Sequence, residues 1–341
     1  MVFIIRNRRS LKFIFIIIIF GISLYLLSCG KDMPVQKLEK ADFALNLPQS
    51  DEASPFEKVK IMKMDSHGNL FILDSGKNLI FKFDSLGNFI KLFGGQGTQC
   101  GKLNFPSGMD IYQDSLLLIH NRGTIDLLDL DGNCLRFIMI RGLADFSISP
   151  RKTIVLNRMN GALELGFFIE AYDLNGKQIN TFGPPRGEVY KNRNADFAFT
   201  GFTSDNNLVY VPAFLDSIYI YDMEGNILKR ARRAIPKSIQ PKVDEPLELL
   251  VEDIYVSNDR IFVLRVDKEN STETEIYVRQ VAEYNLDVEL TNIYELPESI
   301  TMSIEAFAFA PWYHKFIVKD NLFLFMISKP VEHLISFTPH K

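Results

Sequence analysis

The sequence is poor in cysteine, histidine and tryptophan, and it lacks the short motifs that mark many classes of enzyme. Its 341 residues include 3 Cys, 5 His and 1 Trp. It contains no Gly-x-Ser-x-Gly turn that would hold a nucleophilic serine, no glycine-rich phosphate loop and no heptad repeat. His120, His314, His333 and His340 show no spacing typical of metal ligands. These absences exclude a motif-based assignment to serine hydrolases, nucleotide-binding proteins or coiled coils, and they predict neither a metal nor a cofactor.

The chain also lacks excess positive charge and an apolar run of membrane-spanning length. With 38 Lys+Arg and 42 Asp+Glu, its formal net charge is −4, which gives no reason to expect nucleic acid as a partner. The N-terminal apolar run, residues 13–27, has 15 residues, whereas a spanning helix needs about 20. Basic residues, among them Arg6 and Arg8, precede this run. A short apolar segment after a basic one is typical of a secretory signal.

The apolar run ends in Leu26-Leu27-Ser28-Cys29-Gly30, which resembles the bacterial lipobox. The resemblance implies cleavage before Cys29, which would then carry the lipid. We therefore expect a signal peptide over residues 1–28, a lipidated tether over residues 29–39 and membrane attachment through the lipid alone, the alternative being an uncleaved anchor. Because Gly30 rather than Asp follows the cysteine, the resemblance favours the outer membrane, with a periplasmic or a surface-exposed orientation both open.

Short apolar strands separated by polar turns dominate the rest of the chain. Within residues 63–95 three such strands, 70–73, 79–83 and 89–93, alternate with turns rich in Gly and Asn, as in an antiparallel meander. The hairpin recurs at intervals near the 40 to 50 residues expected of propeller blades. The second strands of the six hairpins begin near Leu70, Leu116, Thr153, Leu208, Ile261 and Leu322.

A third strand follows each hairpin, but a fourth strand can be found only five times, because the chain ends after the third strand of the sixth copy. An unpaired outer edge would promote aggregation. Residues 40–48 precede the first copy and have no partner, so we expect them to complete the sixth blade, with 43–47 beside the strand that ends near Pro339. The predicted fold is all-β: a closed, monomeric six-bladed β-propeller of four-stranded antiparallel blades over residues 40–341.

Residues 65–110, with their trailing Gly-Gln-Gly and Pro-x-Gly connection, resemble an NHL repeat. Later copies keep the strand rhythm but lose the motif, and Pro212-Ala213 stands where the motif has Asp-x-Gly. As a whole, the chain resembles the six-bladed β-propeller lipoproteins common in Bacteroidetes. This resemblance implies a lipid-anchored protein of the cell envelope.

Two cysteines, Cys100 and Cys134, remain after lipidation. An oxidising compartment would permit a disulfide between them. However, Cys100 falls in the predicted connection between blades one and two, and Cys134 follows the turn between strands three and four of blade two. These positions lie on opposite faces of a propeller, whereas the Cα atoms of bridged cysteines approach within about 7 Å. We therefore expect two unpaired, partly buried thiols.

One face of the predicted disc gathers long loops that contain basic and aromatic residues. Loops that join strand two to strand three, and those that join successive blades, emerge on the same side. Long loops in compact domains are often functional, and arginine beside aromatic residues is typical of surfaces that bind proteins, carboxylates or sugars. The alternative is that these charges are only solvated. The predicted binding face consists of His120, Arg122, Arg158, Arg186, Tyr190, Arg193 and Trp312.

The sequence supports two metal-site hypotheses less strongly than it supports the binding face. Residues 129–133 begin like a calcium loop, but Ile140 stands at the twelfth position, where a bidentate carboxylate is needed. Some propellers of this type are metal-dependent hydrolases or lyases that gather acids at the central channel. Here Ser147, Phe202 and Tyr255 align with Asp110, so no ring of carboxylates recurs. The acids on the predicted innermost strands are Asp110, Asp196, Glu252, Asp253 and Glu305.

The sequence therefore predicts a lipid-anchored binding or scaffold module of the cell envelope, rather than an enzyme, with a protein or glycan ligand on the loop-rich face. Two alternatives stay open. One is a metal-dependent hydrolase or lyase that uses the channel acids, and the other is a structural partner of an outer-membrane complex without a small-molecule site.

Overall fold

The structure, a computed structural model, describes residues 35–47, 56–140, 144–158, 169–183, 198–213, 217–232, 251–270, 275–297, 302–303, 315–327 and 333–340. The regular elements in these residues are β-strands. None of the residues described forms a helix with the length and apolarity needed to cross a membrane. The chain divides into Met1–Pro34 and a compact unit, Val35–Lys341, and the fold below is that of the second unit.

Four sheets are four-stranded antiparallel meanders, as the hairpin pattern predicts, and each follows the order of the sequence. The strands of the first two are β2 (Val59–Met64), β3 (Leu70–Asp74), β4 (Leu79–Phe83), β5 (Phe89–Gly94), β6 (Pro106–Tyr112), β7 (Leu116–Asn121), β8 (Thr124–Leu128) and β9 (Cys134–Met139). Those of the next two are β10 (Ala144–Ile148), β11 (Ile154–Arg158), β12 (Ile169–Tyr172), β13 (Gln178–Phe182), β14 (Ala198–Phe202), β15 (Leu208–Pro212), β16 (Ser217–Tyr221) and β17 (Ile227–Arg232).

The remaining sheet has nine strands and joins the last two meanders. Its strands are β1 (Val35–Lys40), β18 (Val251–Ser257), β19 (Arg260–Asn270), β20 (Glu275–Tyr284), β21 (Leu290–Glu295), β22 (Met302–Ser303), β23 (Lys315–Lys319), β24 (Leu322–Ile327) and β25 (His333–Pro339). β1 pairs in parallel with β21 and in antiparallel with β25. The prediction of six separate blades is corrected accordingly: four meanders are separate sheets, and β1 merges the other two into one.

The N-terminal strand also corrects the predicted closure of the ring. The sequence predicts that residues 43–47 pair with the last strand, whereas Leu38 lies opposite Pro339 and Lys40 lies opposite Phe337. Residues 35–39, predicted to be tether, therefore belong to the folded unit. The strand is hard to recognise in the sequence because only Leu38, which is 4% exposed, is buried among its six residues.

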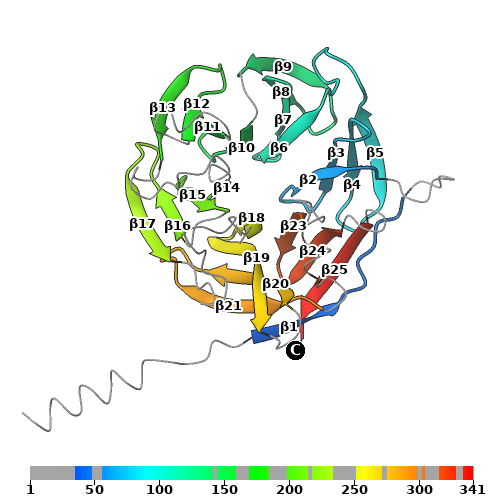
Figure 1. The fold of residues 1–341 in the computed structure, drawn as a ribbon. Coiled ribbons are helices and arrows are strands. Elements are labelled where there is room, and N and C mark those ends of the chain that lie inside the picture. Colours follow the sequence, from blue (N-terminus) through cyan, green and yellow to red (C-terminus); the bar gives the residue numbers. More distant parts are fainter. Residues whose placement is uncertain are drawn as a thin grey trace, which may run out of the picture. The chain divides into compact units, whose positions relative to one another are not determined.

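The strands β2, β6, β10, β14, β18 and β23 surround a common centre (Figure 1). β2 contacts β6, and the contacts continue through β10, β14, β18 and β23 back to β2. β5, β9, β13 and β17 lie on the outside. Apolar side chains of neighbouring meanders pack together, for example Phe71 and Leu73 of the first with Met109 and Leu117 of the second. The arrangement is propeller-like, as the sequence predicts.

A recurring Asp-x-x-Gly-Asn turn joins third and fourth strands. In the first such turn Asp84 Oδ1 accepts hydrogen bonds from the backbone N–H groups of Leu86 and Asn88, and Asn88 Nδ2 donates to Asp84 Oδ2 at 2.9 Å. These bonds, led by that of the Asn88 side chain, lower the pKa of Asp84. Gly87 has a φ of 83°, a conformation that glycine adopts without steric cost. Equivalent bonds form the turns that begin at Asp129 and Asp222, so the pattern predicts these turns correctly.

The residues after β1 continue along the first meander. Asn46 donates its backbone N–H to Gly87 O at 2.8 Å, accepts that of Phe89 at 3.1 Å, and donates Nδ2 to Asn88 Oδ1 at 2.7 Å. On the other side, the Ser336 hydroxyl of β25 donates to the carbonyl oxygens of residues 41 and 43. Residues 35–47 thus bond to both sides of the junction between the last and first meanders, which fixes the ring around its central channel.

Candidate functional site

A cavity of about 290 Å³ lies at the centre of the ring, between the ends of the first strands and the hairpin turns that follow them. β2, β6, β10, β14 and β18 contribute to its wall. Small-molecule sites typically start at about 300 Å³, so this cavity suits a small ligand. Its polar lining residues are Lys63, Asp110, Gln113, Ser147, Ser149, Thr200 and Tyr255.

Lys63 and Asp110 form the charged pair of this cavity. Lys63 Nζ on β2 is 3.0 Å from Asp110 Oδ1 on β6, and the two side chains are 30% and 14% exposed. Asp110 also accepts the backbone N–H of Ile111 on Oδ1 at 3.0 Å and that of Ile148 on Oδ2 at 2.8 Å. Both carboxylate oxygens are therefore engaged, and Asp110 connects β2, β6 and β10.

Hydroxyl groups supply the neutral polar atoms of the cavity. Ser147 Oγ on β10 lies 2.7 Å from Thr200 Oγ1 and 3.0 Å from Thr200 O on β14. Whichever of these oxygens Ser147 donates to, Thr200 Oγ1 keeps at least one lone pair as an acceptor. Burial raises the pKa of Tyr255, and the nearby Lys63 opposes this shift. The phenol therefore stays protonated near neutral pH and can donate a hydrogen bond.

A second, smaller cavity of about 40 Å³ lies further along the channel. Lys315 Nζ on β23 is 3.3 Å from Asp253 Oδ1 on β18 and 5.4 Å from the centre of the Phe199 ring. Asp253 Oδ2 accepts the backbone N–H of Phe316 at 3.2 Å. The channel thus repeats one arrangement, in which an acid on one first strand binds a lysine and a backbone amide of neighbouring strands.

The predicted channel acids do not converge on a metal site in the residues described. Asp110 is engaged by a lysine and two backbone amides, Asp253 by a lysine and the backbone amide of Phe316, and Glu252 is buried. Asp196 and Glu305 lie outside the described residues. A divalent cation prefers several carboxylate or carbonyl oxygens, and the two lysines would oppose its charge.

One group of potential metal ligands occurs in the described part of the chain, namely Asp65, His67 and Asp114. Asn69 donates its backbone N–H and Nδ2 to the two oxygens of Asp65. Ser66 likewise donates its backbone N–H and hydroxyl to Asp114, and these bonds join the first hairpin turn to that of the second meander. The carboxylate oxygens of this group therefore already accept hydrogen bonds, those of Asp65 within its own turn and those of Asp114 between two turns.

The described part of the chain contains three residues of the predicted binding face, His120, Arg122 and Arg158. His120 is wrongly placed there, because its ring is fully buried and Nδ1 lies 2.5 Å from Ser107 Oγ. Its strand, β7, is covered on both faces by neighbouring meanders, which excludes the side chain from the surface. Arg122 is exposed in the turn after β7, and Arg158 ends β11. The predicted residues outside the described part are Arg186, Tyr190, Arg193, Trp312 and Cys29.

The cavity contains residues that no motif in the sequence marks as functional. Lys63, Thr200 and Tyr255 all stand on first strands close to their hairpin turns. A signal does exist, because polar residues interrupt strands that are otherwise apolar. The hairpin alignment places Phe202 rather than Thr200 opposite Asp110, but the hairpin turns differ in length, and Thr200 is the residue that bonds Ser147.

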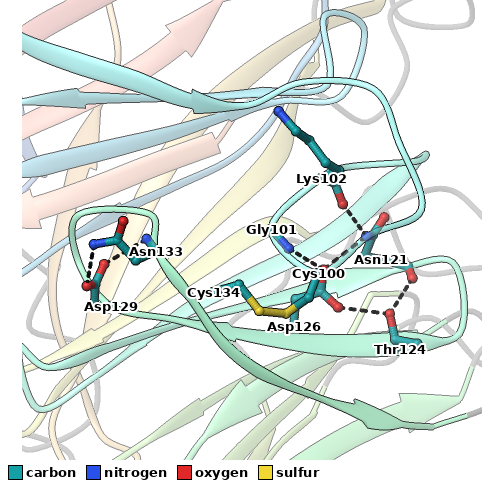
Figure 2. The surroundings of a disulfide bond; sticks show 9 residues. All are labelled: Cys100, Gly101, Lys102, Asn121, Thr124, Asp126, Asp129, Asn133 and Cys134. Atoms are coloured by element: carbon teal, nitrogen blue, oxygen red, sulfur yellow. Dashed lines mark hydrogen bonds between the residues drawn. A yellow bond between two sulfur atoms is a disulfide. The ribbon is translucent and has the colours of Figure 1, made fainter.

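The two cysteines form a disulfide, with a Cα–Cα distance of 5.7 Å, so the prediction of unpaired thiols is wrong (Figure 2). The connection between β5 and β6 does not stay on one face but folds along the second meander. Gly101 N donates to Asp126 Oδ2 at 3.3 Å, and Asn121 Nδ2 donates to Lys102 O at 2.7 Å. Cys100 thereby reaches the start of β9, where Cys134 lies.

Comparison with known proteins defines the fold. No family model and no curated protein matches the sequence. Among solved structures, a member of the DUF4221 family from Bacteroides vulgatus aligns with a TM-score of 0.59 and 13% identity, over 89% of this chain and 97% of the other. An exported protein from Bacteroides fragilis aligns with a TM-score of 0.58 and 13% identity, over 89% and 95% of the two chains. The fold is a β-propeller. A streptogramin B lyase shares it with a TM-score of 0.51 and 14% identity, over 84% and 81% of the two chains.

Proposed function

We propose that this propeller is an exported, lipid-anchored protein of the cell envelope that acts as a binding module rather than as a metal-dependent hydrolase or lyase. The observation that carries the proposal is the central cavity with its Lys63–Asp110 pair. Lys63 and backbone amides already bond the Asp110 carboxylate. The cavity therefore offers hydrogen-bonding groups to a ligand, but it does not offer the several free carboxylates that a metal cation would need.

Three observations support export and anchoring. The Cys100–Cys134 disulfide is typical of an oxidising compartment. The N-terminus combines basic residues, a short apolar run and a lipobox-like Cys29. Structurally similar Bacteroides proteins include one described as exported. We propose Cys29 as the lipid attachment site, with Gly30 favouring the outer membrane.

The loop-rich face remains part of the proposal as a surface for a protein or glycan partner. Arg122 supports this part of the proposal, because it is exposed in the turn between β7 and β8. It would act with the predicted residues Arg158, Arg186, Tyr190, Arg193 and Trp312. His120 no longer belongs to this surface, because it is buried.

The test compares the full chain with Cys29→Ala in a bacterial host that lipidates exported proteins. We expect the full chain to fractionate with membranes and to incorporate labelled palmitate, and the variant to do neither, because the lipid alone supplies membrane affinity. The full chain, purified from native membranes, should retain a ligand or partner detectable by native mass spectrometry. Membrane retention of the unlipidated variant, or a purified chain that carries nothing, would count against the proposal.

A further inference from the structure

The charges of the central cavity cancel. Lys63 and Asp110 are its only charged residues among the described residues that line it, and they lie 3.0 Å apart. An anionic ligand would have to draw Lys63 away and leave Asp110 beside it, whereas a cationic ligand would meet Lys63. Separating a partly buried pair is costly because one charge is left without its partner. The cavity therefore favours a ligand without net charge.

The hydrogen-bonding groups of the cavity differ in kind. A lysine ammonium only donates, and a carboxylate only accepts, here through Asp110 Oδ2, which takes one backbone N–H and has a second lone pair. Thr200 Oγ1, which bonds Ser147, can accept, and the Tyr255 hydroxyl can both donate and accept. A ligand that meets all four groups needs both donors and acceptors at several points. Hydroxyl groups satisfy this requirement, because each of them donates one hydrogen bond and accepts two.

The same cavity has apolar walls. Met64, Phe202, Ile254 and Val256 line it, together with the ring of Tyr255. A purely polar ligand would leave these side chains in contact with water or with polar atoms. A sugar ring has C–H groups on its faces and hydroxyls at its edge, so it can contact apolar walls and polar groups at the same time.

We propose that the central cavity binds a neutral, polyhydroxylated ligand of monosaccharide size, either a free sugar or the terminal sugar of a glycan. The volume of about 290 Å³ limits the enclosed part to about one ring. This inference rests on the proposed binding function and names the ligand class of the same cavity.

The test is isothermal titration calorimetry on the full lipidated chain in a detergent without a sugar headgroup. The neutral probes are methyl glycosides of glucose, galactose, mannose and N-acetylglucosamine, which imitate terminal residues, and the corresponding free sugars. The charged probes are glucuronate, glucosamine and glutamate. We expect at least one neutral probe to bind, and each charged probe of related shape to bind about 10-fold more weakly or not at all. Preference for the methyl glycoside indicates a glycan terminus, and preference for the free sugar indicates a soluble ligand.

Variants connect binding to the cavity. Lys63→Met is expected to weaken binding of the neutral probe about 10-fold, because it removes a charged donor, and Tyr255→Phe or Thr200→Val about 5-fold. The matched control is Lys82→Met. Lys82 Nζ also pairs with an aspartate, at 3.3 Å from Asp131 Oδ1, but neither residue lines the cavity. Circular dichroism during thermal unfolding verifies that each variant is folded. If Lys63→Met fails to fold, Tyr255→Phe replaces it as the variant that tests binding in the cavity.

Three results would overturn the inference. These are tighter binding of a charged probe, equal losses in Lys63→Met and Lys82→Met, and no binding of any probe. In the first two cases the protein still binds a ligand, so the proposed function survives. If no probe binds but a ligand or partner co-purifies from native membranes, only the proposed ligand class is contradicted. If no probe binds and nothing co-purifies, the proposed binding function is contradicted as well.

Discussion

At the scale of single residues, the turn glycines do more than allow a positive φ. A Cβ atom added to Gly225 would lie 2.7 Å from Phe182 Cβ, so the fourth meander packs its turn directly against the third. Gly176 has the same relation to Ile138 of the second meander. The fifth meander has Val288 at this place, with a φ of 60° and 4% exposure. There, burial of the side chain offsets the backbone strain, which the sequence pattern alone does not reveal.

We expect Gly225→Ala to destabilise the protein by more than Gly95→Ala. Both glycines have positive φ, 90° and 84°, so both variants incur about 1–2 kcal/mol of backbone strain. Beside Gly95 the nearest atom is Lys102 Nζ at 3.6 Å, whereas Phe182 obstructs a Cβ at Gly225. Because of this clash, Gly225→Ala is expected to lower the free energy of unfolding by about 1–3 kcal/mol more than Gly95→Ala does. Guanidinium denaturation of the two variants measures the difference, and equal midpoints would refute the packing argument.

At the scale of elements, the connection between β5 and β6 behaves as part of the second meander. Leu103 is fully buried in the cluster that joins the first two meanders. Asn121 fixes the same segment, since its Oδ1 accepts the backbone N–H of Asn104 at 2.7 Å. Strand rhythm predicts where this connection begins and ends but not its course. Its course depends on side chains of β7 and β8, and for that reason the disulfide could not be predicted from strand order.

Removing the disulfide should therefore destabilise the protein without changing the fold. The bridge spans a sequence separation of 34 residues, and closing a loop of this size typically contributes about 2–4 kcal/mol. The double variant Cys100→Ser/Cys134→Ser is expected to lose this amount in chemical denaturation. Wild type in reducing buffer should match the double variant, and because it keeps both cysteine side chains it separates loss of the bridge from loss of the side chains. If reduction leaves the midpoint unchanged, the bridge contributes nothing to stability.

At the scale of the whole molecule, the sequence predicts the all-β class, the hairpins and an N-terminal segment that closes the ring. Apolar alternation and Gly-Asn turns are local signals, and the structure confirms them in β2 to β5. The closing strand itself could not be located, because β1 is mostly polar and gains its role only from two partners far away in the sequence. The central cavity is not predictable from the sequence for a related reason. Its wall combines residues from five strands, and the register of these strands depends on turn lengths.

Leu38→Ala tests whether β1 secures the whole ring. Leu38 is 4% exposed and packs among residues of both meanders that β1 joins, including Phe262 and Phe337. We expect the free energy of unfolding to fall by about 2–4 kcal/mol, because truncating this buried leucine leaves a cavity between the two meanders that β1 joins. Val35→Ala on the same strand is the control, since Val35 is 52% exposed and should cost about 0.5 kcal/mol or less. Loosened pairing would also expose the edges of β21 and β25, so Leu38→Ala should aggregate faster on size-exclusion chromatography. A variant as stable and as monodisperse as Val35→Ala would mean that the ring closes without the help of its N-terminal strand.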